Sequence, residues 1–159
     1  MVYLEPMTEE AWAPILHRRI AQYAEEQARA GRWSEDEALE QATAEFAKML
    51  PDGISTERHH IHTIVETASD TGVGYLWYEE REKAGRPCAF LCDIGVFPDY
   101  RRRGFALAAL EALADLVAHE HGTMRLELHV FGRNGAARAL YAKAGFAETN
   151  VLMAKTLDG

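Results

Sequence analysis

The chain of 159 residues is poor in cysteine and proline, with 2 Cys and 5 Pro. It also lacks any apolar run close to the ~18 residues that a membrane-spanning helix needs. Its first residues, MVYLEPMTEE, show no basic segment followed by an apolar one, which is the pattern of a secretory leader. We therefore expect a cytoplasmic protein with no membrane partner.

The two cysteines, Cys88 and Cys92, lie four residues apart in the strand-like run PCAFLCDIGVF. Four residues of extended strand separate Cα atoms by ~13 Å, whereas a disulfide needs roughly 4.4–6.8 Å. The sequence therefore predicts two reduced thiols in the core rather than a disulfide between them.

Positive charge is also scarce, because 17 Lys+Arg stand against 25 Asp+Glu, giving a net charge of −8. This balance disfavours nucleic acid as a partner, although a local basic cluster can still hold one anion. The hydrophobic fraction of 48% excludes a disordered chain. Residues 1–159 thus predict one globular domain with a real core.

The N-terminal third predicts a short strand and two helices. Met1–Pro6 fits the strand, and Thr8, followed by two glutamates, is typical of a capped helix start. Pro14 predicts a kink or a restart in this helix, which ends at Gly31. Ser34–Glu37 has the pattern of a capping box and begins the second helix, which the sequence PDG then ends.

Strand-like and helical segments alternate through the rest of the chain. Three alternating segments separated by turn residues predict an antiparallel meander. The expected elements are strands at 59–68, 73–82 and 88–97, a helix Gly104–His121, a strand at 124–131, a helix Asn134–Ala144 and a last strand at 146–155. No internal repeat interrupts this order, so we predict an α+β domain.

A basic loop joins the third meander strand to the helix at Gly104. The stretch Val96–Ala106 reads VFPDYRRRGFA, with three arginines directly before a glycine. The first N–H groups of a helix have no internal partner, and small residues there let an anion approach the backbone. The stretch predicts an anion site, and the alternative is a basic turn with solvated arginines.

Two motifs resemble those of the GNAT (Gcn5-related N-acetyltransferase) family. The first, V-x-P-x-x-R-x-x-G-x-A, covers Val96–Ala106, and the second, N-x-x-A-x-x-L-Y-x-K-x-G-F, covers Asn134–Phe146. The resemblance extends over roughly Tyr75 to Lys155 and implies a layered α/β/α fold. Its mixed, mostly antiparallel sheet would carry two N-terminal helices and a splayed middle pair of strands.

The resemblance also implies acetyl-CoA as co-substrate. Its pyrophosphate would lie on backbone N–H groups across Arg102–Ala106, and its pantetheine arm would pair with the edge Ile94–Val96. Arg103 and the alanine at 106 depart from the commonest family pattern without removing this expectation. The residues expected to bind the cofactor are Ile94, Gly95, Val96, Arg101, Arg102, Arg103, Gly104, Phe105, Ala106, Asn134, Ala137, Tyr141 and Lys143. For Asn134, the N-cap of the following helix is a second interpretation, and for Lys143 a solvated helix position is another.

Acetyl transfer to an amine needs a general acid for the leaving thiolate and a polarised carbonyl. The resemblance implies Tyr141 as the acid and the Val96 N–H as the oxyanion donor. A phenol is protonated at neutral pH and is able to donate to sulfur. The alternative for Tyr141 is a tyrosine that only packs between helix and sheet.

Three residues are candidates for the general base: Asp93, His129 and Glu127. Asp93 shares a strand face with Gly95, and Glu127 shares one with His129, so neighbouring strands would bring these side chains to one cavity. Each also has a structural alternative, such as an ordinary hydrogen-bonded strand residue, and a water relay is a further option.

The histidine-rich run at 59–62 does not predict a metal site. Only His60 and His62 share a strand face there, and no third ligand follows at convincing spacing. We therefore expect no metal cofactor.

The leading hypothesis is an N-acetyltransferase that moves an acetyl group directly from acetyl-CoA to a primary amine of a small molecule or peptide. The acidic balance favours a cationic acceptor, and no cysteine stands out as a nucleophile. One rival is a non-catalytic acyl-CoA-binding sensor, and another is a phosphate- or nucleotide-binding protein unrelated to acyl transfer. The sequence leaves the oligomeric state open, a homodimer being one option.

Overall fold

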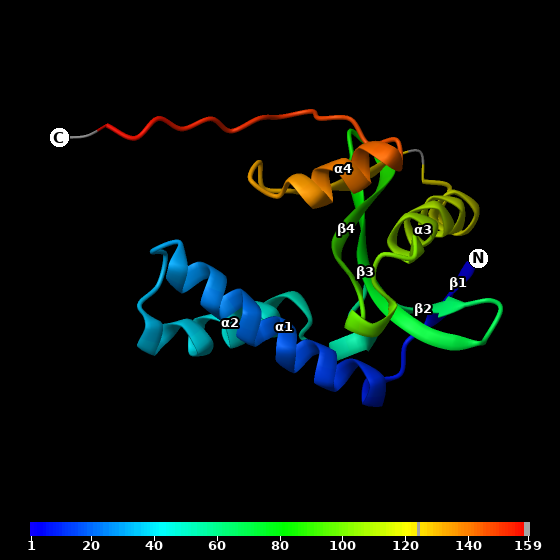
Figure 1. Ribbon diagram of the computed structural model, residues 1–159, viewed down its shortest axis with the longest axis horizontal. Helices are drawn as coiled ribbons and strands as arrows, with labels where there is room; N and C mark the ends of the chain where they lie inside the picture. The colour runs from blue at the N-terminus through cyan, green and yellow to red at the C-terminus, as the bar shows by residue number, and fades with distance from the viewer. Residues whose placement is uncertain (124, 158–159) are drawn as a thin grey trace.

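A computed structural model, which describes residues 1–123 and 125–157, shows a mixed α+β fold (Figure 1). The elements are β1 (Val2–Pro6), α1 (Glu9–Arg29), α2 (Glu35–Met49), β2 (His59–Glu66), β3 (Thr71–Lys83), β4 (Arg86–Val96), α3 (Phe105–His121), β5 (Leu126–Leu128) and α4 (Gly135–Lys143), with short 3-10 turns at Gly53–Ser55 and Pro98–Tyr100. The α+β prediction is confirmed, and both cysteines are free thiols as expected.

The sheet has the order β1-β2-β3-β4-β5. The pairs β1–β2, β2–β3 and β3–β4 are antiparallel, which confirms the meander, and β4–β5 is parallel. Among residues 1–123 and 125–157, β5 pairs with β4 along Ala89–Leu91, although β4 continues to Val96. The middle strands therefore separate after Leu91, as the splayed pair in the sequence prediction requires.

Helices cover both faces of the sheet, which gives the layered arrangement (Figure 1). On one face α3 packs through Leu110 and Leu113 against Leu76 and Tyr78. On the other face lie α1 and α2, and Trp12 of α1 is buried in a cluster with Trp77, Ile61 and Tyr75. Among the described helices, none is at once long and apolar enough to cross a membrane.

The N-terminal helices show no restart at Pro14 and no capping box at Ser34. The Thr8 hydroxyl caps α1 by accepting from the Ala11 N–H at 3.2 Å, but the helix neither ends nor restarts at Pro14. Proline removes a single hydrogen bond near the start of the helix, and the buried side chains of Trp12 and Ile15 hold the helix on either side of it. The Ser34 side chain makes no capping hydrogen bond, so the expected capping box does not form.

Of the last two predicted strands, the first is shorter than predicted and the second is absent from the described residues. The strand expected at 124–131 is reduced to Leu126–Leu128, and its first residue, Met124, lies outside the described residues. No strand forms at 146–155; there the chain runs past α4 and away from the sheet (Figure 1). Val151 and Leu152 are 65% and 98% exposed. Alternation alone does not make a strand, because the backbone also needs a hydrogen-bonded partner, and this segment has none among the described residues.

Candidate active site

A β-bulge at Cys92 marks the point where β4 and β5 part. Trp77 of β3 pairs with Asp93, and the next residue, Tyr78, pairs with Leu91, so Cys92 is an extra residue with no opposing partner. Leu91 is also the last residue of β4 that pairs with β5. A bulge bends its strand and ends regular pairing, which explains why the gap opens here.

Beyond the bulge, one edge of β4 pairs with no strand in the described part of the chain. The Phe97 N–H donates to the Val73 carbonyl on β3 at 2.9 Å. Amides of successive strand residues point to opposite edges, so the amides of Ile94 and Val96 point away from β3, toward the unpaired side. The Arg101 Nε donates to the Val96 carbonyl at 3.1 Å, which places that guanidinium at the same edge. The edge Ile94–Val96 is therefore positioned to pair with an extended ligand.

The loop after β4 leads into a helix start that carries no side-chain cap. Gly104 is the N-cap of α3 at φ 82°, ψ 10°, and Arg102 also has a positive φ of 63°. A Cβ at Gly104 would meet only the Met1 Cε, at 3.9 Å, so the space beside the first amides is open. The first N–H groups of α3, at Phe105 and Ala106, have no carbonyl partner within the helix, so the geometry of this turn suits an anion.

The three arginines of this loop are all exposed. Arg103 lies over the Tyr100 ring, with its guanidinium carbon 5.7 Å from the ring centroid. The three arginines, including Arg101 at the β4 edge, give the turn a positive potential. Salt screens the more distant negative charges of the chain, so this local potential remains effective. The donor set therefore fits the diphosphate of a nucleotide cofactor.

Helix α4 holds the second motif. The Asn134 side chain caps this helix by accepting from the Ala137 N–H at 3.2 Å, which confirms the N-cap interpretation. Lys143 is exposed in the last turn, at the opposite end of the helix from Asn134.

Tyr141 of α4 is half-buried, and its ring contacts Phe146 at 5.9 Å between centroids. Burial raises the pKa of Tyr141, and the negative charge of Asp93 raises it further. Tyr141 is thus a hydroxyl that stays protonated at neutral pH, as a general acid must.

Asp93 is the centre of a partly buried polar cluster. Its Oδ2 accepts from the Arg19 Nε at 2.6 Å and from the Tyr75 hydroxyl at 2.9 Å. Burial raises the pKa of Asp93 above its usual range, and the Arg19 charge and these hydrogen bonds oppose that effect. Gly95 makes room for the cluster, since a Cβ there would lie 2.5 Å from the Tyr75 Cε1. Arg19 lies 74 residues away on α1, and no local sequence signal identifies it.

The other two candidate bases lie elsewhere. Glu127 accepts from Lys83 and from Arg125, each at 2.7 Å, and these two cations lower the pKa of Glu127 to about 2. It stands opposite Phe90, three residues before Asp93, so the structure does not bring these two carboxylates together. His129 is exposed beyond the end of β5, edge-on to the Phe131 ring at 5.1 Å.

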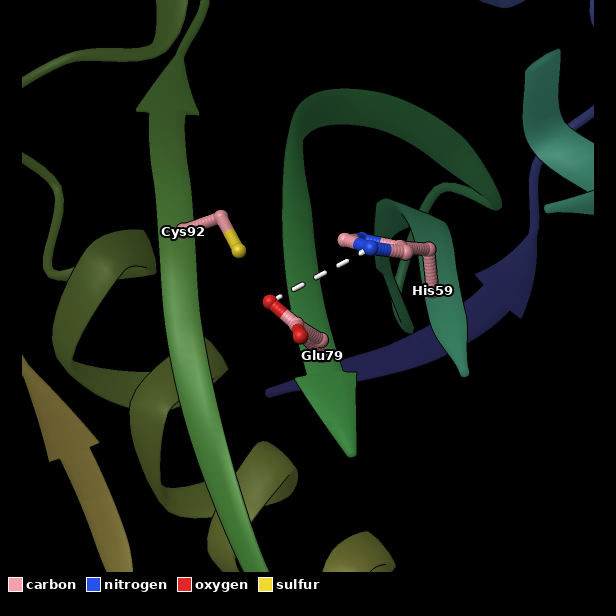
Figure 2. A group of neighbouring side chains, drawn as sticks. All are labelled: His59, Glu79 and Cys92. Carbon is pink, nitrogen blue, oxygen red and sulfur yellow. Dashed lines mark ion pairs between the residues drawn. The ribbon is translucent and has the colours of Figure 1, made fainter. Parts of the chain in front are cut away.

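Three further side chains meet on the face of the sheet that α1 and α2 cover. Figure 2 shows His59, Glu79 and Cys92 pointing toward one another from β2, β3 and β4. The His59 Nδ1 accepts from the Trp77 indole N–H at 2.9 Å, and its Nε2 lies 4.0 Å from the Glu79 carboxylate. Burial raises the pKa of Cys92 to about 12, so its thiol stays protonated and is no nucleophile.

A mixed sheet that opens beside an uncapped helix N-terminus is the framework of the N-acetyltransferases. The model of the Acetyltransferase (GNAT) family matches residues 20–146, and the chain belongs to this family.

Relatives along the whole chain agree with this assignment. The chain is 37% identical to the uncharacterized N-acetyltransferase YycN of Bacillus subtilis (strain 168) over 156 residues, covering 98% of this chain and 99% of YycN. The crystal structure of YycN superposes with a TM-score of 0.87 at 36% identity, covering all of both chains. YdgE of the same strain, also an uncharacterized N-acetyltransferase, is 34% identical over 154 residues, 97% of each chain.

A more distant relative has a named acceptor. The [ribosomal protein bS18]-alanine N-acetyltransferase of Escherichia coli (strain K12) is 36% identical over 95 residues, covering 53% of this chain and 63% of that protein.

Proposed function

We propose that this N-acetyltransferase moves an acetyl group from acetyl-CoA directly to a primary amine of a small molecule or peptide, in the cytoplasm. The observation that carries the proposal is the free edge Ile94–Val96 directly beside the uncapped helix start at Gly104. An extended, amide-rich arm that ends in a diphosphate fits these two features together.

The chain's own groups would hold the cofactor along this path. Amides across Arg102–Ala106 would bind the diphosphate, with Arg101 and Arg103 adding charge. The strand edge would pair with the pantetheine arm, and the start of α4 at Asn134 would border it. Ala137 and Lys143 would add contacts from the same helix. When bound, acetyl-CoA supplies the acetyl group as an activated thioester.

Tyr141 would donate a proton to the leaving thiolate, because burial and Asp93 keep its hydroxyl protonated. Asp93 is our preferred base for the incoming amine, with its carboxylate held by Arg19 and Tyr75. His129 stays an alternative base, since it is exposed and free to approach a bound acceptor. The Val96 N–H would face the developing oxyanion.

The acceptor is proposed to be a cationic primary amine. Asp93 and Glu79 both lie on the side of the sheet covered by α1 and α2, where Arg19 and Arg81 already pair with them, so an ammonium group would share these two carboxylates with the guanidinium groups. The relative that acts on an alanine of ribosomal protein bS18 supports a peptide amine as one class. We also propose a homodimer as one option for the oligomeric state, which a measurement of the molecular mass in solution would test.

Release of free CoA thiol, measured with a panel of small and peptide amines, tests the function. Tyr141→Phe is expected to lower kcat about 100- to 1,000-fold with little change in the KM for acetyl-CoA, as loss of a general acid does. Tyr23→Phe is the matched control, because its hydroxyl bonds Glu45 between α1 and α2, away from the cofactor edge.

Two outcomes would contradict the proposal. Tight CoA binding with no turnover of any amine, and no effect of Tyr141→Phe, would favour the sensor. Stronger stabilisation of the fold by ATP than by CoA would favour a nucleotide-binding protein instead.

A further inference from the structure

Three potential metal ligands meet on the sheet face that α3 covers. The His60 Nε2 lies 2.6 Å from Glu80 Oε2, and the His121 Nδ1 lies 3.2 Å from Glu80 Oε1. They come from β2, β3 and the last residue of α3, and the three ligand atoms all lie within 4.8 Å of one another. Two imidazoles therefore converge on the two oxygens of a single carboxylate.

Tyr78 orients both imidazole rings. Its hydroxyl forms a hydrogen bond with the His121 Nε2 at 3.0 Å, and its ring stacks on His60 with centroids 4.8 Å apart and planes at 22°. The tyrosine itself is buried. Metal-binding histidines are usually fixed by such a partner on the second ring nitrogen, because it sets the tautomer and the direction of the lone pair.

The surroundings admit a cation. His121 ends α3, where the unpaired helix carbonyls favour positive charge. Glu80 and His121 line an open hollow of about 370 Å³ to which Glu57 and Glu82 add acidic groups and Arg58 a basic one. Arg81 also lines the hollow, but its guanidinium is held 3.0 Å from Glu79 and over the Phe90 ring.

We propose that His60, Glu80 and His121 bind one Zn²⁺ ion, with water completing the coordination. Two histidines and a carboxylate are a common zinc ligand set. Ligand atoms around tetrahedral zinc lie ~3.3 Å apart, since the Zn–N and Zn–O bonds are ~2.0–2.1 Å. The observed 2.6 and 3.2 Å contacts go to different oxygens of Glu80, and the three ligand atoms lie within 4.8 Å of one another, so the side chains would adjust by side-chain rotation to bring both imidazoles to one ion. The ion would replace the imidazole N–H groups that now face Glu80, and the His121 proton would move to Nε2, where the Tyr78 oxygen accepts it. The site would tie the end of α3 to the sheet, apart from the acetyl-transfer groups.

The neighbouring residues on the same strands give a built-in comparison. His59 and Glu79 form the corresponding pair on the opposite face, with Cys92 beside them (Figure 2). There the Trp77 N–H occupies the His59 Nδ1 lone pair, so the neutral ring carries its proton on Nε2, toward Glu79. That nitrogen therefore has no lone pair to offer a metal. We expect this second cluster to bind no zinc.

Calorimetric titration of Zn²⁺ into tag-free, metal-stripped protein tests the site, with Co²⁺ absorption spectra reporting nitrogen coordination. We expect a stoichiometry of one. Glu80→Gln and His121→Ala should each weaken binding at least about 100-fold, and Tyr78→Phe about 10-fold, since loss of an outer partner alone costs roughly 10- to 100-fold. Glu79→Gln and His59→Ala are the matched controls and should leave zinc affinity unchanged.

Thermal unfolding keeps the test decisive for variants that fold less well. Zn²⁺ should raise the melting temperature of the wild-type protein and of Glu79→Gln but not that of Glu80→Gln. The glutamine side chain in Glu80→Gln has nearly the same shape as glutamate but carries no negative charge. No zinc binding to the wild type, or binding that Glu80→Gln leaves intact, would overturn the proposal. Neither result depends on whether acetyl transfer occurs.

Discussion

Arg19→Met removes the cation that faces Asp93 and keeps most of the side-chain volume. Arg19 and Asp93 side chains are 25% and 17% exposed, so water replaces little of the lost interaction. A hydrogen bond between charged groups contributes ~1.5–3 kcal/mol, and at this partial exposure we expect a loss of about 2 kcal/mol in unfolding free energy at neutral pH. The Tyr75 hydroxyl, 2.9 Å from the same oxygen, limits the loss.

The effect depends on pH in a defined direction. Burial already holds the pKa of Asp93 above its usual value, and the variant raises that pKa further because an opposing cation is gone. Where pH lies below the ordinary pKa, the carboxyl is neutral in the folded and unfolded states, and the penalty is absent. The penalty grows as pH rises through the raised pKa and is complete above it. Arg19→Met should therefore cost more at pH 8 than at pH 5.

Urea unfolding of a double-mutant cycle measures this coupling directly. The cycle combines Arg19→Met with Asp93→Asn, and the interaction energy should be about 2 kcal/mol at pH 8 and smaller at pH 5. If Asp93 is also the base, the acidic limb of the kcat/KM profile should move to higher pH in Arg19→Met. A coupling below ~0.5 kcal/mol at pH 8, within the usual additivity error, would refute the reasoning.

Two other substitutions test the helix starts. Gly104→Asp would place a carboxylate beside the first amides of α3 and strain the left-handed backbone at this position, so CoA affinity measured by calorimetry should fall about 100-fold, the equivalent of losing one or two charge-assisted hydrogen bonds. Gly104→Asn, which lacks the charge, should lose less, and equal affinity in all three proteins would exclude the anion site. Thr8→Ala should lower the unfolding free energy by ~1 kcal/mol, whereas Ser34→Ala should change it by only a few tenths, because Thr8 makes a capping bond and Ser34 makes none. Equal losses in chemical denaturation would show that the difference between the two caps has no energetic consequence.

Much of the fold could be predicted because its signals are local. The helix expected at Gly104–His121 is observed at Phe105–His121, since a glycine marks each end and the apolar stripe between them meets the sheet. The Asn134 cap likewise depends only on the residues that follow it. The segment at 146–155 has an equally local signal, but a strand also needs a partner edge, and the sequence does not contain that information.

Side-chain clusters depended on distant residues and could not be predicted. The sequence supplied His60 and a face-sharing His62 as potential ligands, yet the structure joins His60 to Glu80, 20 residues on, and through it to His121 at the far end of α3. Arg19 is similar, because it reaches Asp93 only when α1 lies across the sheet. Such pairs follow from the packing of whole elements, to which no spacing rule applies.

The position of Asp93 itself depends on one irregularity that strand periodicity hides. Ala89 and Leu91 pack on the α3 side of the sheet, so strict alternation would place Asp93 on that side as well. The extra residue Cys92 reverses the alternation, which turns Asp93 toward Tyr75 and Arg19 and returns Ile94 and Val96 to the α3 side. The same residue also ends the pairing with β5. A single inserted residue therefore both opens the strand edge proposed for the cofactor and turns the proposed base toward the acceptor side, so the two halves of the site cannot vary independently.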